Sequence, residues 1–227
     1  MNAPADPHSY RCVCGDSFQV EPIAVGRLVF CPRCRSPVIT PVSDGGLARE
    51  LKIDLSSSRL DLPLATPGDW KEIYPITSDE KNYEFELSHP DDRGALLAGL
   101  KRSRFPSGFC KSRLLTFFTK RKSDGAAIGL VHLQIEEGHF SGYLGIMVHH
   151  PFQRMGYGAE ALEAVADFAF GTLNLRRLWS SCDARNQGCI SLLNKCGFRQ
   201  EGLMQCAGYH VRRGWIDIPV FARIRRE

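Results

Sequence analysis

A glycine-bearing turn is the strongest chemical signal in this 227-residue sequence. Residues 151–159 read Pro-Phe-Gln-Arg-Met-Gly-Tyr-Gly-Ala, between a predicted strand that ends at His149 and a predicted helix that begins near Gly158. A glycine-bearing loop that enters a helix gathers backbone N–H groups at the positive end of the helix dipole. Such groups bind phosphate or pyrophosphate, so the turn predicts an anionic ligand.

Two nucleotide-binding motifs compete for the same turn. Gly156-x-Gly158-x-x-Ala161 also satisfies the dinucleotide fingerprint, and Arg176 lies about where a residue selective for NADP would sit. We reject this interpretation because the loop before the first glycine is too long and the motif comes late in the chain. Too few β-α units follow it to build a doubly wound domain. A P-loop is excluded because no Gly-Lys-Ser/Thr follows the turn.

Four cysteines near the N-terminus are spaced as zinc ligands. They form two close pairs, Cys12 and Cys14, then Cys31 and Cys34. Two such pairs separated by a hairpin suit tetrahedral zinc, with His8 as the substitute if the first pair has unsuitable geometry. A segment of ~40 residues needs a staple of this kind because its core is too small to offset chain entropy. The pattern at residues 8–42 resembles short bacterial zinc ribbons, which implies the metal but leaves the ribbon's partner open.

The composition excludes other classes of protein. A hydrophobic content of 43% excludes a disordered chain, and no apolar run approaches the ~20 residues that span a bilayer. Residues 1–10 lack the apolar core of a signal peptide, so we expect a cytoplasmic protein without membrane attachment. A net charge of +4 does not by itself indicate nucleic-acid binding. Residues 101–122 are rich in basic side chains without any acid, which is typical of a solvated face or of a docking surface for an anionic partner.

The elements that position these residues alternate between strands and helices from residue 59 onward. Predicted strands cover residues 60–64, 113–120, 127–136, 142–149, 177–182, 199–207 and 215–224. Predicted helices cover residues 91–104, 158–170 and 187–196, and another begins near Trp70. The fold class is therefore an α/β domain around a mixed sheet, at residues 58–227. A zinc ribbon at residues 1–42 and a linker at residues 43–57 precede it.

Two segments of this domain together resemble the GNAT superfamily of N-acetyltransferases. Gln153-x-x-Gly156-x-Gly158 is similar to the acyl-coenzyme A pyrophosphate loop of that superfamily, Q/R-x-x-G-x-G/A. Residues 183–198, D-A-R-N-Q-G-C-I-S-L-L-N-K-C-G-F, are similar to a segment of its ribosomal-protein N-terminal acetyltransferase branch, N-x-x-S/A-x-x-x-x-x-K-x-G-F. Shorter matches, such as G-W-x-D at residues 214–217, extend the resemblance over about residues 58–227. It implies a mostly antiparallel central sheet flanked by helices, and acetyl-CoA as co-substrate.

The resemblance also implies which residues hold acetyl-CoA. Backbone groups of Met147, Val148 and His149 are expected along the pantetheine arm, and the side chain of Asn186 is expected to contact it. The pyrophosphate falls to the loop, which contains Gln153, Arg154, Met155, Gly156, Tyr157, Gly158 and Ala159. For Asn186 an ordinary helix N-cap is the alternative, and the two roles can coexist.

The implied reaction needs a proton donor for the thiolate that leaves when an amine attacks the thioester. The oxyanion of the intermediate falls to a backbone amide of the fourth strand. Many superfamily members use a tyrosine seven residues after the asparagine, and this chain has Leu193 at that position. The ribosomal-protein branch uses a serine three residues after the asparagine, and this chain has Cys189 there. Cys189 is therefore the candidate catalytic donor, with packing in an apolar helix face as the alternative. The other cysteines outside the ribbon are predicted to be packing residues: Cys110, Cys182, Cys196 and Cys206.

The proton acceptor is missing from its expected place. The branch carries a glutamate in an A-E-Y segment, where residues 207–209 of this chain read Ala-Gly-Tyr. The remaining candidates are His132, His149, Glu136 and Glu137. An α-amine, with a pKa of ~8 against ~10.4 for lysine, needs less help to lose its proton. The predicted acceptor is therefore a protein N-terminal α-amine, with a small-molecule amine such as an antibiotic or a polyamine second.

One alternative belongs to another functional class. The missing tyrosine and glutamate suit an acyl-CoA-binding module without catalysis, whose zinc ribbon docks a protein or a nucleic acid. The predicted partners are thus acetyl-CoA, an amine acceptor and, at the ribbon, a protein or nucleic acid. The oligomeric state stays open, with a homodimer as one alternative to a monomer.

Overall fold

The computed structural model describes residues 9–11, 17–19, 28–30, 32–33, 37–39, 53–87, 92–104, 112–136 and 140–225. Two short hairpins lie at the N-terminal end: β1 (Ser9–Arg11) pairs with β2 (Ser17–Gln19), and β3 (Leu28–Phe30) with β4 (Pro37–Ile39). The four predicted zinc ligands, Cys12, Cys14, Cys31 and Cys34, lie outside the described residues, as does the substitute His8. The zinc ribbon therefore stays a prediction.

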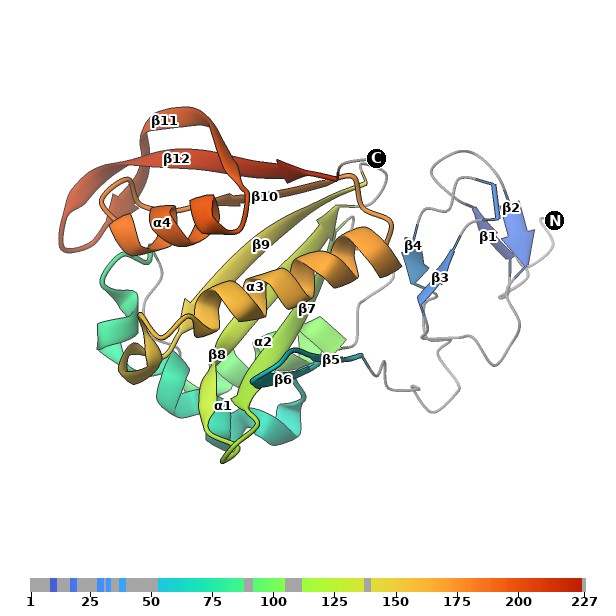
Figure 1. Ribbon diagram of the computed structural model, residues 1–227, viewed down its shortest axis with the longest axis horizontal. Coiled ribbons are helices and arrows are strands. Elements are labelled where there is room, and N and C mark those ends of the chain that lie inside the picture. The colour runs from blue at the N-terminus through green and yellow to red at the C-terminus, as the bar shows by residue number, and fades with distance from the viewer. Residues whose placement is uncertain are drawn as a thin grey trace, which may run out of the picture.

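An eight-stranded sheet forms the centre of the remaining chain, in the order β11-β12-β10-β9-β8-β7-β6-β5 (Figure 1). Its strands are β5 (Asp54–Ser56), β6 (Leu60–Pro63), β7 (Ser112–Arg121), β8 (Ala127–Glu136), β9 (Ser141–Val148), β10 (Arg177–Ser181), β11 (Arg199–His210) and β12 (Gly214–Ile224). Within this described sheet, neighbouring strands pair antiparallel except β9 and β10, which are parallel. The predicted α/β fold with a mostly antiparallel sheet is confirmed.

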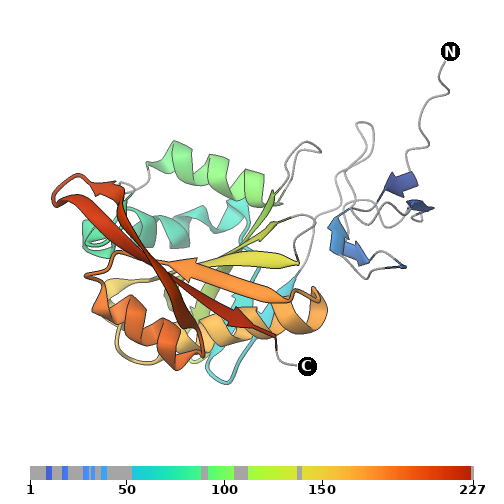
Figure 2. The ribbon, with the colours of Figure 1, turned by 90° about the horizontal axis from the view of Figure 1, so that it is seen from above.

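Helices cover both faces of the sheet. Helices α1 (Trp70–Thr77) and α2 (Arg93–Arg104) lie on one face, and α3 (Tyr157–Asp167) and α4 (Gln187–Lys195) on the other (Figure 2). Shorter helical turns are η2 (Pro67–Asp69), η3 (Glu80–Tyr83), η4 (His150–Phe152) and the π-helical η5 (Phe168–Thr172). None of the helices in the described part of the chain is long and apolar enough to cross a membrane.

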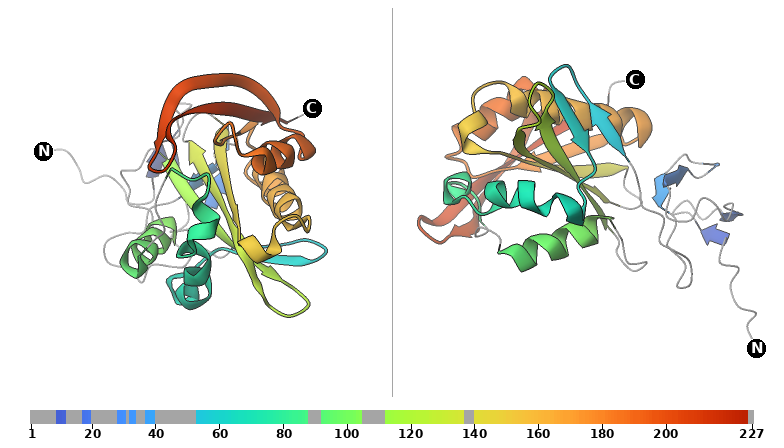
Figure 3. Two further views of the ribbon diagram at one scale, coloured as in Figure 1. Left: turned by 90° about the vertical axis from the view of Figure 1, so that its left-hand side faces the viewer. Right: turned by 90° about the horizontal axis from the view of Figure 1, so that it is seen from below.

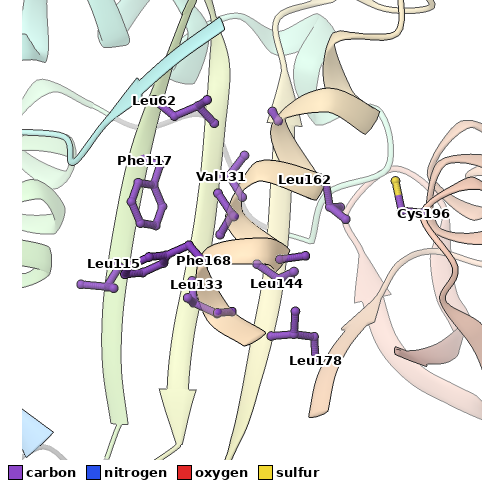
Figure 4. Close-up of a cluster of buried hydrophobic side chains, with 14 of the residues drawn as sticks. Leu62, Leu115, Phe117, Val131, Leu133, Leu144, Leu162, Phe168, Leu178 and Cys196 are labelled. Carbon is purple, nitrogen blue, oxygen red and sulfur yellow. The ribbon is translucent and has the colours of Figure 1, made fainter. Parts of the chain in front are cut away.

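Strand alternation sends each strand's side chains into two separate cores. Phe117, Val131 and Leu144 point toward α3, where they pack with Leu162 (Figure 4). Their neighbours in sequence point the other way, and Phe118 and Leu130 pack with α1 and α2. The near-continuous apolar runs of β7 and β8 thus follow from burial on both faces of the sheet. Figure 3 shows from two sides the helices that cover these faces.

The sheet begins earlier in the chain than the predicted domain. Strand β5 pairs with β6 at Leu55↔Leu62, inside the range expected to be a linker. The loop between these strands is fixed to α3 by Glu160. Its carboxylate accepts hydrogen bonds from the Ser57 hydroxyl at 2.6 Å, from the backbone N–H of Arg59 at 2.7 Å and from the Arg59 guanidinium at 2.6 Å.

Removal of the Glu160 charge is expected to destabilise the domain. Burial would raise the pKa of this carboxyl, but the hydrogen bonds from Ser57 and Arg59 outweigh it and lower the pKa to about 2. Because the pKa of Glu160 is lower in the folded than in the unfolded protein, its charge stabilises the fold fully at a pH above the unfolded-state pKa of 4.5. This contribution to the free energy of unfolding is lost as the pH falls toward 2. Glu160→Gln should therefore cost roughly 3 kcal/mol of unfolding free energy at pH 7 and little near pH 2.

Urea unfolding across this pH range is the measurement, with Glu72→Gln as control. Glu72 is half-exposed and forms one surface ion pair with Lys120, so its loss should change stability by less than about 1 kcal/mol. Equal effects of the two substitutions at pH 7 would contradict the assignment.

Candidate functional site

Strands β9 and β10 separate after a short stretch of pairing. They pair at Ser141↔Arg177, Gly142↔Leu178 and Tyr143↔Trp179, and then diverge (Figure 1). Residues 144–148 of β9 have no strand beside them on this edge within the described chain. Because backbone N–H and C=O groups must find hydrogen-bond partners, this edge can accept an extended ligand.

The glycine turn follows directly from the free end of β9. Gly156 has φ of +82° and is the N-cap of α3, a conformation that favours glycine. Gly158 is needed for close approach, because a Cβ there would lie 3.2 Å from the Val148 Cγ2 atom. The first amides of α3 have no intrahelical acceptor. The turn therefore presents N–H groups beside the open edge of β9, as an anion site requires.

A cavity of about 1090 Å³ connects this turn to the opposite face of the sheet. Its floor on the α1 and α2 side consists of residues that are adjacent across β7, β8 and β9, in the rows Leu114–Gln134–Tyr143 and Thr116–His132–Gly145. Gly156, Gly158 and Leu192 line the cavity on the α3 and α4 side. One ligand can thus reach in from the turn while another approaches from the α1 and α2 side.

The turn between β10 and α4 places Asn186 and Cys189 on this cavity. Asn186 is the N-cap of α4, and its Oδ1 accepts a hydrogen bond from the Cys189 backbone N–H at 2.9 Å. The turn is fixed by Asp183, whose side chain is 1% exposed and is joined to Arg185 by an ion pair at 2.8 Å. Asn186 therefore has the N-cap role, and its NH₂ group is not consumed by the cap.

Cys189 lies beside a second thiol, that of Cys182, at the end of β10. The interaction with Cys182 raises the pKa of Cys189, as does burial. The same interaction lowers the pKa of Cys182. Both cysteines are free and line the cavity, so the structure places a thiol pair where sequence analysis found a single candidate.

The other cysteines have different outcomes. Cys196 is 2% exposed and packs in the core, as predicted. The prediction of a packing role for Cys206 is wrong, because Cys206 is exposed in an irregular part of β11 with φ of +48°. Cys110 lies outside the described residues.

The candidate proton acceptors lie in different surroundings. His132 is on the cavity floor with its Nδ1 3.1 Å from the Thr116 hydroxyl, and burial lowers its pKa to about 4. The Glu136 carboxylate accepts a hydrogen bond from the Trp179 indole at 3.3 Å, and Glu137 is outside the described residues. His149 contacts Asp79, at 3.5 Å, and is not part of the cavity lining.

Sequence analysis missed one carboxylate in the cavity, that of Glu86. Within the described residues no hydrogen bond or ion pair reaches this carboxylate, and Glu86 is exposed to solvent where it lines the cavity. Desolvation by the surrounding protein raises its pKa. Its negative charge helps to raise the pKa of Tyr143 and of Cys189, which line the same cavity. Glu86 follows η3 in a segment without helical or strand periodicity, so no pattern marked it.

Most predicted coenzyme-binding residues meet at the cavity. The lining contains Met147, Val148, Gln153, Arg154, Gly156, Gly158, Ala159 and Asn186. Three predicted residues are not in the lining. Tyr157 is buried with its hydroxyl 3.4 Å from the Arg121 guanidinium, Met155 is exposed, and His149 lies beside Asp79. Because the roles predicted for them are those of backbone groups, their side chains are free to point elsewhere.

Comparisons with known proteins agree with this geometry. The sequence profile of the acetyltransferase (GNAT) domain matches residues 59–199. Uncharacterized N-acetyltransferase YnaD from Bacillus subtilis (strain 168) is 25% identical over 150 residues, which cover 60% of this chain and 77% of YnaD.

Two solved structures illustrate the likeness of fold. Ribosomal-protein-S5-alanine acetyltransferase from Vibrio fischeri has a TM-score of 0.65 and 16% identity, over 77% of this chain and 98% of that one. Spermidine N-acetyltransferase from Vibrio cholerae, in complex with CoA and spermine, has a TM-score of 0.64 and 19% identity, over 74% of this chain and 96% of that one. The chain belongs to the GNAT acetyltransferase family, and it is an N-acetyltransferase that uses acetyl-CoA.

Proposed function

We propose that this N-acetyltransferase acts on the α-amine of a protein or peptide N-terminus, with Glu86 as the general base. The observation that carries the proposal is the Glu86 carboxylate, which lies in the cavity without a partner in the described chain. A base must be ionised and close to the amine, and a raised pKa strengthens its pull on the proton. An α-amine is the class of amine that such a carboxylate can deprotonate most easily.

The surroundings of Gly208 explain why the base comes from another segment. Gly208 stands where the resembling branch has its glutamate, and a Cβ there would lie 3.0 Å from the Leu87 Cδ1 atom. Leu87 therefore fills the space above β11 that a longer side chain would need. Its neighbour in sequence, Glu86, brings a carboxylate to the cavity from the η3 side instead.

The coenzyme site fits acetyl-CoA on three observations of the described residues. These are the open edge of β9, the glycine turn at the start of α3 and the continuous cavity between them. Backbone groups of Met147 and Val148 would hold the pantetheine arm on one side, and the side chain of Asn186 would contact it from the α4 side. The backbone amides that follow Arg154 would hold the pyrophosphate. When bound, acetyl-CoA supplies the thioester whose acetyl group passes to the amine.

The proton donor is assigned to the thiol pair. Cys189 remains a thiol at neutral pH because its pKa is raised, so it has a proton to give. Cys182 is a second thiol beside it, and its pKa is lowered. After Cys189 gives its proton to the CoA thiolate, the separate thiol proton of Cys182 can pass to Cys189, and the Cys182 thiolate is then reprotonated from solvent.

Charges near the cavity favour an N-terminus over a polyamine. The Glu84 carboxylate, which lines the cavity, is 2.8 Å from the Arg213 guanidinium, and the nearby Glu80 carboxylate is 3.0 Å from that of Arg212. A polycation needs several free carboxylates, whereas an N-terminus has a single amine next to a neutral backbone. Of these three carboxylates, Glu86 alone has no cationic partner in the described chain.

An acceptor panel tests the proposal. The acceptors are a peptide with a free N-terminus, the same peptide with a blocked N-terminus and one lysine, and spermidine, with release of the CoA thiol as the signal. At pH 7 the neutral fraction of an α-amine exceeds that of lysine by ~200-fold, so kcat/KM should be higher for the free N-terminus by about that factor. Faster turnover of spermidine or of the lysine peptide would contradict the proposed acceptor. Calorimetry with acetyl-CoA confirms separately that the coenzyme site is intact.

The N-terminal segment keeps its predicted role as a zinc ribbon. We propose Cys12, Cys14, Cys31 and Cys34 as the ligands and the ribbon as a docking module for a protein or nucleic acid. Salt-sensitive binding that is lost when residues 1–45 are deleted would support a nucleic-acid partner.

A further inference from the structure

Three side chains that can bind a metal meet at the end of β9, outside the cavity lining. They are Asp79, from the connection between α1 and η3, and the consecutive residues His149 and His150. The Asp79 Oδ2 atom lies 3.0 Å from His150 Nδ1 and 3.5 Å from His149 Nε2, and all three ligand atoms lie within 4.8 Å of one another. We propose that this cluster binds a divalent transition metal ion of the zinc type.

The spacing of the ligand atoms suits such an ion. Zinc binds nitrogen and carboxylate oxygen at about 2.0–2.1 Å, so two ligand atoms on a tetrahedral ion are about 3.3 Å apart. The two Asp79–histidine distances, 3.0 and 3.5 Å, lie on either side of this value. Two imidazoles and one carboxylate are also a ligand set that zinc uses, with a further position left for water.

Neighbouring groups orient the ligands. The second oxygen of Asp79, Oδ1, accepts a hydrogen bond from the Lys81 backbone N–H at 3.0 Å, which leaves Oδ2 turned toward both imidazoles. The backbone N–H of His150 donates to the Asn82 side chain at 2.8 Å. The ring of His149 packs edge-on against Phe152, with ring centroids 6.0 Å apart. Hydrogen bonds and packing contacts of this kind orient the side chains that bind a metal, and they raise the affinity of the site for the ion.

A metal-free pair of Asp–His hydrogen bonds is the alternative to a bound ion. One carboxylate oxygen can accept from both imidazoles, at 3.0 Å from His150 and 3.5 Å from His149, so the metal titration decides between the two. The same two distances allow one carboxylate and two imidazole nitrogens to share one cation.

The site would join two parts of the enzyme. Asp79 precedes η3 and the segment that carries Glu86, whereas His149 and His150 lead from β9 into the glycine turn. A bound ion would thus tie the acceptor side of the cavity to the coenzyme side. Because it binds only the folded chain, it would also raise the melting temperature.

The test is titration of the chelator-treated full chain with Co²⁺, followed by calorimetry and absorption spectroscopy. The cluster lacks sulfur, so its cobalt complex shows no thiolate-to-metal charge-transfer band, whereas cobalt on the ribbon cysteines does. We expect a binding step without the thiolate band, with about one equivalent per chain. Asp79→Asn and His150→Gln should weaken this step by at least about 10-fold and should remove the rise in melting temperature.

Glu80→Gln is the matched control because Glu80 is adjacent to the site but pairs with Arg212. It should keep the sulfur-free step unchanged. Retained acetyl-CoA binding shows that each variant is folded. The proposal would be overturned if the wild-type chain bound cobalt only with the thiolate band. It would also be overturned if the binding step without that band were equally strong in the wild type, Asp79→Asn and His150→Gln.

Discussion

Replacement of Gly129 by alanine is expected to destabilise the domain by about 3 kcal/mol or more and to weaken acetyl-CoA binding by at least about 10-fold. A Cβ on Gly129 would lie 2.1 Å from the Met147 carbonyl oxygen and 3.1 Å from the Val148 Cα atom. These are backbone atoms of the neighbouring strand, so no side-chain rotation relieves the clash. Strand β9 must move away from β8 at the residues that are proposed to hold the pantetheine arm.

Urea unfolding and calorimetry with acetyl-CoA measure the two effects. Gly202→Ala is the control, because Gly202 also lies in a strand but a Cβ there meets no atom within 4 Å. Its stability should stay within about 0.5 kcal/mol of the wild type. If Gly129→Ala lost stability but bound acetyl-CoA with unchanged affinity, the proposed role of Met147 and Val148 would be wrong.

Glu86→Gln is expected to lower kcat by about 100-fold without a change in acetyl-CoA affinity, because general base catalysis contributes ~10²–10⁴-fold. The raised pKa of Glu86 has a further consequence for the pH profile. The base acts only when ionised, so wild-type kcat should fall as the pH drops through this raised value. Glutamine cannot ionise, and the variant should lose this acidic limb of the profile.

The matched control for Glu86 is Glu84→Gln. Glu84 lines the same cavity but pairs with Arg213, so its loss should leave the acidic limb in place. Cys189→Ala is the second arm of this experiment, because it should lower kcat and leave the acidic limb intact if the thiol pair is the donor. An acidic limb that persists in Glu86→Gln would assign the base to another residue, with His132 the next candidate on the cavity floor.

Sequence analysis predicted those helices and strands in which apolar residues recur at a regular spacing. Helix α3 repeats apolar residues on one face, and the alternating or doubly buried strands β7, β8 and β9 were placed to within about two residues. The glycine turn was recognised because its function depends on backbone conformation, which Gly156 and Gly158 reveal by their type. Strand β5 escaped because it has only three residues, Asp54–Ser56, and the last of them already belongs to the serine run at residues 56–58, so it carries too little pattern.

The parts of the site that escaped depend on contacts between distant segments. Glu86 and Asp79 lie in irregular segments beside η3, which pack against β9 and β11. Only this packing shows that Glu86 has no partner in the described chain and that Asp79 faces two imidazoles. Cys182 and Cys189 are separated by the β10–α4 turn, so their contact depends on how that turn closes. Cys206 was misjudged because it lies where the pairing of β11 with β12 shifts register, between Met204 and Gly208, and no sequence pattern marks this irregularity.

The short pairing of β9 with β10 also divides the sheet mechanically. One block ends at β9 and the other begins at β10, and a ladder of three residue pairs joins them. Beyond that ladder α4 packs between the blocks, where Leu193 and the C-cap residue Cys196 lie in the same core as Leu162 of α3. The width of the gap between β9 and β10 therefore depends on the size of a few apolar side chains, together with the ion pair between Arg223 of β12 and Glu163 of α3. Substitutions between two helices would change this width while the sheet stays unchanged.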